Sequence, residues 1–145
     1  MQVKTIRCTR IITFDSAHRV VNHESKCKYL HGHTYRAEFT FEADKLDDLG
    51  RVIDFGVIKT KLKTWIDANL DHNTILNICD KSFGEQIEKT FQQNVYYLPN
   101  NPTAENIASH LLEEICPKLF ADQQNCKCIK IKLWETPNCF VVVKF

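Results

Sequence analysis

The sequence predicts an α+β fold in which an antiparallel four-stranded sheet carries two helices on one face. Three observations support this prediction. Strand patterns occupy both ends of the chain, two helical patterns lie between them, and the strands occur in runs that hairpins can join. The expected order is therefore strand, strand, helix, helix, strand, strand (ββααββ). The 145 residues suit a single domain that spans residues 1–145.

The first two expected strands lie near the N-terminus. Residues 4–16 are rich in β-branched side chains, and residues 33–43 alternate strictly between apolar and polar side chains. Residues two apart on a strand point to the same face, so the second strand has one face that can be buried. That face comprises Tyr35, Ala37, Phe39, Phe41 and Ala43.

Two helices are expected in the middle of the chain. The first runs through residues 55–70, where apolar residues recur three or four positions apart, and Asp54 is its N-cap. The second lies within residues 101–120, with Thr103 as its N-cap. Pro117 is expected to end or kink this second helix.

The remaining segments are a poorly patterned stretch and a C-terminal hairpin. Residues 73–101 show little periodicity, apart from a short helical pattern within residues 82–94. Residues 130–135 alternate, and residues 139–145 begin with a continuous apolar run, so a turn between them predicts a hairpin.

Composition and charge exclude several kinds of protein. The chain is 43% hydrophobic and 26% charged, which is typical of a globular protein. Its 19 basic and 18 acidic residues leave a net charge of +1, so we expect no surface for nucleic acid or acidic membranes. No apolar run reaches the roughly 18 residues that a membrane span needs.

The seven cysteines indicate a reducing environment. The N-terminus lacks the apolar core of a signal peptide, so free thiols in the cytoplasm are expected rather than disulfides. Four of the thiols are expected to be small, buried hydrophobic side chains, namely Cys8, Cys79, Cys116 and Cys139.

Histidines at the start of the second strand indicate a metal site. His31 and His33 flank one glycine, so both project to the same face and can converge on one ion. If the first two strands pair as a hairpin, His18 lies beside them, and three ligands leave zinc an open, catalytic position. Alternatively, the pattern arises by chance. The other two histidines considered, His23 and His110, are expected to be solvated.

Cys27 stands close to this group, with three residues between it and His31. It is either a fourth zinc ligand, which would close a structural site, or an acid or base beside the metal. The spacing alone leaves both interpretations open.

Three carboxylate and imidazole residues complete the set of candidates. Asp71 next to His72 could orient or charge the imidazole, although such neighbours are common by chance. Glu135 continues the alternate positions of its strand that are expected to be buried. A buried carboxylate needs a partner. A planar ligand with two adjacent N–H groups would pair with it through two hydrogen bonds. The alternative is a frayed strand end with Glu135 in water.

Taken together, these residues resemble the 6-pyruvoyltetrahydropterin synthase / 6-carboxytetrahydropterin synthase family. The matching motifs occur in the family's order, namely FDSAHR, CKYLHGHTYR, VIDF, LDH, NPTAEN and WET. The resemblance implies the tunnelling fold (T-fold), with trimers that pack into hexamers and close their sheets into a barrel. It also implies a catalytic Zn²⁺ held by His18, His31 and His33.

The resemblance implies roles for the other candidates as well. Cys27 would be the general base, and Asp71 and His72 would assist it. Glu135, which is sometimes grouped with this relay, would anchor the pterin ring of 7,8-dihydroneopterin triphosphate, and Thr103 would be a further substrate-binding residue.

Two branches of the family differ in their products. The carboxy branch, which belongs to 7-deazaguanine (queuosine) synthesis, releases acetaldehyde and triphosphate, whereas the pyruvoyl branch releases triphosphate only. The short spacing in CKYLHGH and the motif VIDF favour a zinc-dependent lyase of the carboxy branch. The pyruvoyl synthase is the alternative, and a non-catalytic module with a structural zinc site is an alternative of another class. Residues 73–100 exceed the length found in short members, so this insert could reshape the site.

Overall fold

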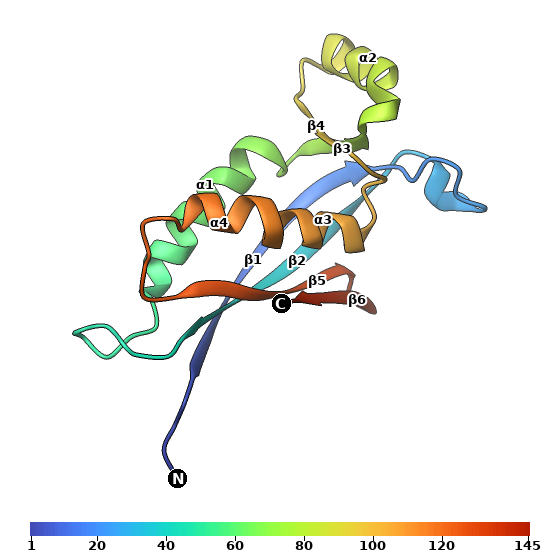
Figure 1. Cartoon of the computed structure of the whole chain (residues 1–145). Coiled ribbons are helices and arrows are strands. Elements are labelled where there is room, and N and C mark those ends of the chain that lie inside the picture. Colours follow the sequence, from blue (N-terminus) through green and yellow to red (C-terminus); the bar gives the residue numbers. More distant parts are fainter.

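The computed structural model describes residues 1–145 and shows a six-stranded mixed sheet with helices packed against one face (Figure 1). The strand order is β4-β3-β1-β2-β5-β6. The strands are β1 (Ile6–His18), β2 (His31–Ala43), β3 (Asn73–Asn77), β4 (Val95–Leu98), β5 (Lys127–Thr136) and β6 (Cys139–Lys144). The helices are α1 (Phe55–Asn69), α2 (Lys81–Phe91), α3 (Ala104–His110) and α4 (Cys116–Leu119), with short 3₁₀ turns at Lys26–Lys28 and Ile78–Asp80.

The four predicted antiparallel strands are present as β1, β2, β5 and β6, which are the longer strands of the sheet. β1 pairs with β2 along its whole length, β2 pairs with β5, and β5 pairs with β6, all antiparallel. The predicted inner face of β2 is confirmed, because every one of its five apolar side chains is buried. The pairing also sets His18 opposite His31, so the hairpin brings two distant segments together.

The prediction of only four strands, all antiparallel, was wrong. The segment after α1 adds β3, which pairs with β1 in parallel, and β4, which pairs with β3 in parallel. Parallel neighbours need a crossover connection, and α2 supplies it. The short helical pattern within residues 82–94 is therefore confirmed as α2. The two strands have five and four residues, which is too short for a periodic pattern to stand out.

Helix α1 forms as predicted and covers one face of the long hairpin (Figure 1). The side chain of Asp54 accepts a hydrogen bond of 2.7 Å from the Gly56 amide and caps the helix. Ile58, Leu62 and Ile66 are fully buried, so the predicted apolar stripe is the contact surface with the sheet.

The second predicted helix is also present, but Pro117 does not end it. Thr103 caps α3 by accepting a 3.2 Å hydrogen bond from the Asn106 amide. The next five residues, Leu111–Ile115, form a π-helical turn, after which α4 continues to Leu119. Proline lacks the N–H that an α-helix requires, and the change of hydrogen-bond register in the π turn accommodates it.

The cysteines are all free thiols, but their predicted burial is largely wrong. Cys116 is buried as expected, Cys8 is half-buried, and Cys79 and Cys139 are exposed. Cys79 lies in a surface turn and Cys139 begins the outermost strand, where no layer covers it. Among the helices, none has both the length and the apolar character that crossing a membrane requires.

The contact of α1 with the sheet can be tested at Leu62, which is fully buried. Truncation in Leu62→Ala leaves a cavity and should lower the free energy of unfolding by about 2–5 kcal/mol. Urea denaturation measures this change. The exposed neighbour variant Thr64→Ala should stay within about 0.5 kcal/mol of the parent. Equal effects of the two variants would contradict the packing described.

Candidate metal centre and adjoining cavity

His18, His31 and His33 converge at the end of the β1–β2 hairpin. His18 pairs with His31 and Ser16 pairs with His33, so all three imidazoles project from the same face of the sheet. The ring centroids lie 4.6 Å apart for His18 and His31, 5.0 Å for His18 and His33, and 4.8 Å for His31 and His33. One nitrogen of each ring lies within 4.8 Å of the others. The structure thus brings together the three ligands expected from the sequence.

Backbone carbonyls orient two of these rings. Nδ1 of His18 donates to the carbonyl of Pro102 at 2.7 Å, and Nδ1 of His31 donates to the carbonyl of Tyr29 at 2.7 Å. The proton of each neutral ring is therefore on Nδ1, and Nε2 carries a lone pair. Such outer hydrogen bonds commonly fix the tautomer of metal-binding histidines.

The inward-facing nitrogens fit a metal ion. Nε2 of His18 and Nε2 of His31 are 3.1 Å apart, and two lone pairs at this distance repel unless a cation lies between them. Burial lowers the pKa of His18 to about 4, although its bond to Pro102 opposes the shift, so a second proton is disfavoured at neutral pH. Nε2 of His33 is buried and has no hydrogen-bond partner. A zinc ion would satisfy all three nitrogens and keep an open position.

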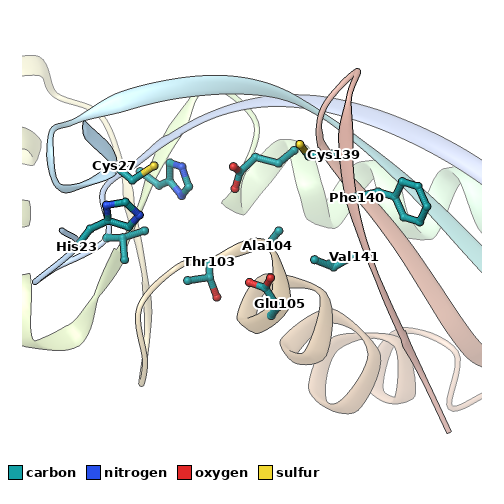
Figure 2. A pocket seen from close by; sticks show the side chains of 11 residues that line it. His23, Cys27, Thr103, Ala104, Glu105, Cys139, Phe140 and Val141 are labelled. Carbon is teal, nitrogen blue, oxygen red and sulfur yellow. The ribbon is translucent and has the colours of Figure 1, made fainter. Parts of the chain in front are cut away.

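A cavity of about 280 Å³ adjoins the cluster. Its walls come from the loop between β1 and β2, the start of α3 and the strand β6. Figure 2 shows Cys27 and His23 on one side, with Thr103 and Glu105 at the start of α3 and Cys139 across the cavity.

Four predicted site residues, His18, Cys27, Thr103 and Glu135, therefore line one cavity. Cys27 is half-buried and lies outside the group of converging nitrogens.

Two histidines differ from the prediction that they are solvated. His23 is half-buried on the cavity wall, where its Nδ1 accepts a 2.9 Å hydrogen bond from the Ser25 amide. His110 is half-buried because its ring packs against Tyr96, and Nε2 forms a 2.6 Å hydrogen bond with the hydroxyl of that residue. The ring of His110 is covered by a residue of the added strand β4, which periodicity does not reveal.

Glu135 lies between the metal cluster and a second hollow of the surface. Its Oε1 is 3.7 Å from Nε2 of His33, and the side chain is 27% exposed. Burial raises the pKa of the nearby Tyr35, and the charge of Glu135 adds to that effect. The second hollow is lined by Glu135, His33, Arg36 and Trp134, among others. The Glu135 side chain is therefore mostly covered by protein and still accessible to N–H donors of a ligand.

Asp71 and His72 lie on the other face of the hairpin. They form a group with Asp15, whose neighbour Ser16 faces the histidines, so alternation turns Asp15 away from them. Nδ1 of His72 donates to Asp71 at 2.9 Å, and the Asp15 amide donates to Asp71 at 2.8 Å. The structure does not place this pair in the cavity of Cys27.

Asp71 and His72 nevertheless shift each other's pKa. Burial by itself would raise the pKa of Asp71, but the hydrogen bonds from the Asp15 amide and from His72 lower it overall. In turn, the hydrogen bond and charge of Asp71 raise the pKa of His72. His72 is therefore protonated more readily than an ordinary histidine, which suits a proton donor.

Sequence reasoning missed the residues that hold the site in place. The carbonyl of Pro102 orients His18, yet a carbonyl belongs to every residue and leaves no pattern in the sequence. Glu105 stands in the NPTAEN motif, and its position two residues after the helix cap could have indicated that it faces the cavity.

Removal of one imidazole tests the metal site. His33→Ala should weaken zinc binding by more than the roughly 10–100-fold that outer-shell changes typically cost. Isothermal titration of metal-stripped protein, with zinc content measured after dialysis, gives the affinity. His23→Ala is the matched control, because His23 lines the cavity but is not among the converging rings. Unchanged zinc affinity in His33→Ala would rule out the three-histidine site.

Comparisons with known proteins agree with this architecture. The family model described as 6-pyruvoyl tetrahydropterin synthase matches residues 7–144. The 6-carboxy-5,6,7,8-tetrahydropterin synthase of Rickettsia typhi is 58% identical over 138 residues, which cover 95% of this chain and 99% of the relative. The protein of that name from Haemophilus influenzae is 31% identical over 140 residues, covering 92% and 95%.

Solved structures share the fold. An uncharacterized protein from Wolinella succinogenes superposes with a TM-score of 0.81 at 23% identity, covering 97% of this chain and 98% of that chain. A 6-pyruvoyltetrahydropterin synthase variant from Plasmodium vivax gives a TM-score of 0.74 at 18% identity, with the same coverage. With a family model that spans nearly the whole chain and full-length relatives of this kind, the chain belongs to the 6-pyruvoyl tetrahydropterin synthase family.

Proposed function

We propose that this chain is a zinc-dependent 6-carboxy-5,6,7,8-tetrahydropterin synthase. Its substrate would be 7,8-dihydroneopterin triphosphate, and its products 6-carboxytetrahydropterin, acetaldehyde and triphosphate, formed in the cytoplasm for 7-deazaguanine (queuosine) synthesis. One observation carries the proposal: three converging imidazoles adjoin a cavity that also holds a thiol and a carboxylate. Full-length relatives that bear this enzyme's name support the choice of branch.

The metal and the thiol would share the chemistry. When bound, zinc would polarise and acidify a substrate hydroxyl at its open position. Cys27 lies on the wall of the same cavity and outside the ligand group, which suits a proton carrier better than a fourth ligand. Its thiolate would accept a proton from carbon or oxygen of the substrate side chain and return it at the next step.

Glu135 and Thr103 would hold the substrate. A pterin presents two adjacent N–H groups, which match the two oxygens of the Glu135 carboxylate. Because the Glu135 side chain is only 27% exposed, protein already shields much of it from competing water. The oxygen of Thr103 accepts the capping hydrogen bond of α3, so its hydroxyl proton remains available to a substrate acceptor.

Assistance by Asp71 and His72 would require a neighbouring subunit. Within one chain the pair lies on the opposite face of the hairpin from the histidines. We therefore propose a homo-oligomer, a trimer or a hexamer built as a dimer of trimers, in which this pair approaches Cys27 of another chain. The edge strand β6 carries exposed Phe140 and Val142, which pairing with a neighbour would cover.

The pyruvoyl synthase remains the second candidate, because the solved structures that share the fold include pyruvoyl enzymes. The same residues would serve it, with release of triphosphate alone. A module with a closed structural zinc site is less well supported, because Cys27 is not among the converging ligand atoms.

Product analysis tests the proposed reaction. Purified zinc-loaded protein, supplied with 7,8-dihydroneopterin triphosphate, should release acetaldehyde and triphosphate in equal amounts. Chromatography of the carbonyl derivative and of the polyphosphate quantifies both, and the His33→Ala protein is the matched blank. Triphosphate without acetaldehyde would show the pyruvoyl branch instead, and release of neither would refute both enzymes.

The role of Cys27 is tested separately. Cys27→Ala should keep its zinc and lose about 10²–10⁴-fold in kcat, the usual contribution of general acid–base catalysis. Steady-state kinetics and zinc analysis on the same sample give the two readings. Cys79→Ala, which removes an exposed thiol, should behave like the parent. Full activity would remove the proposed base, whereas loss of zinc would favour the structural module.

A further inference from the structure

The loop that carries Cys27 (residues 19–30) is fixed by few hydrogen bonds. The Val20 amide donates to the carbonyl of Cys27 at 2.8 Å, which ties the two ends of the loop together. Beyond the loop and the strand ladder, its hydrogen bonds reach only Asp80, Asn101 and His31. The position of Cys27 therefore depends on a small number of residues.

Asn101 holds the loop with both ends of its amide. Its Oδ1 accepts from the Val21 amide at 3.2 Å, and its Nδ2 donates to the Val21 carbonyl at 3.0 Å. One side chain thus satisfies both backbone groups of Val21, next to the residue bonded to Cys27. The following residue, Pro102, offers its carbonyl to Nδ1 of His18. Two consecutive residues therefore hold the thiol loop and a metal ligand.

The amide of Asn101 is itself held in one orientation. Oδ1 also accepts from Nδ2 of Asn77 at 3.1 Å, and Asn77 ends β3. The backbone carbonyl of Asn101 accepts from Nδ2 of Asn106 at 2.9 Å, which links it to α3. Reversal of the amide would place Asn101 Nδ2 against the donors of Val21 and Asn77, so the observed orientation is strongly favoured.

The same segment supports the start of the loop. Arg19, directly after His18, forms two hydrogen bonds with Asp80, at 2.6 Å and 2.5 Å, and its guanidinium lies 4.3 Å from the ring centre of Phe83. Such two-pronged pairs fix geometry as well as adding energy. The segment from β3 to α2 therefore supports the start of the loop.

We propose that Asn101 is a positioning residue for the reaction, whose amide holds the Cys27 loop at a fixed place beside the metal ligand His18. The proposal rests on the role of Cys27 proposed above. Loss of the amide would free Val21 and, through Val20, the backbone of Cys27. Misplacement of a catalytic group by about 1 Å can cost about 10²-fold in rate. His18 would stay in place, because it is held by a backbone carbonyl.

Asn101→Ala tests the proposal in zinc-loaded protein. We expect unchanged zinc content, KM within about twofold, and kcat lower by about 10–100-fold. A second reading needs no turnover: iodoacetamide should alkylate Cys27 faster, as followed by mass spectrometry of its peptide, because the freed loop uncovers a half-buried thiol. Asn125→Ala is the matched control, since it removes an amide-to-carbonyl bond to Val52 away from the site. It should match the parent in every reading.

Asn77→Ala gives a graded second variant, which removes the bond that orients the Asn101 amide and also the capping bond that the Cys79 amide donates to Asn77. This variant should lower kcat by about two- to fivefold and retain its zinc. If circular dichroism shows that Asn101→Ala does not fold, the Asn77 variant takes its place in the kinetic test. Parent-like kcat and alkylation in the folded Asn101 variant, or joint loss of zinc and activity, would overturn the proposal. Full activity of Cys27→Ala would instead refute the proposed base, while the alkylation rates would still report on the loop.

Discussion

The convergence of three imidazole nitrogens on one point is the constraint on which the candidate site depends. Two of these nitrogens are 3.1 Å apart, and a third is buried without a partner, an arrangement that is unfavourable without a cation. The β1–β2 ladder creates it, because its register sets His18 opposite His31. A slip of one residue would turn one strand's histidines to the other face, so the buried core of the hairpin also fixes the register on which the candidate metal site depends.

The β3–α2–β4 unit links the outer part of the sheet to this centre. It adds two parallel strands beside β1, where that strand ends in His18. The unit also supplies Asn77 and Asp80, which contact the residues that hold the Cys27 loop. Residues 73–100, which look like an insertion in the sequence, thus support the Cys27 loop, which has little regular structure of its own.

Much of the fold could be predicted, because local patterns determine it. Strict alternation identified β2, and the cap Asp54 with its apolar stripe identified α1. Likewise, the His-x-His spacing together with His18 on the pairing strand predicted that three imidazoles lie close together, as they do. The strands β3 and β4 were missed because pairing with β1, and not their own pattern, makes them strands. The hydrogen bond that orients His18 was missed because it comes from a backbone carbonyl.

The separation of the candidate residues between two faces follows from the alternation of a strand. Along β1, Ser16 and His18 face the helices, whereas Asp15 faces outward and holds Asp71. Gly32 of β2 lies where the backbone of β1 comes close. A β-carbon at this position would come within 3.3 Å of the carbonyl oxygen of Ser16. Within one chain the Asp71–His72 pair does not line the cavity of Cys27, so a reaction that uses both would need a second chain to bring them together. The chemistry proposed for this chain and its proposed assembly therefore depend on each other.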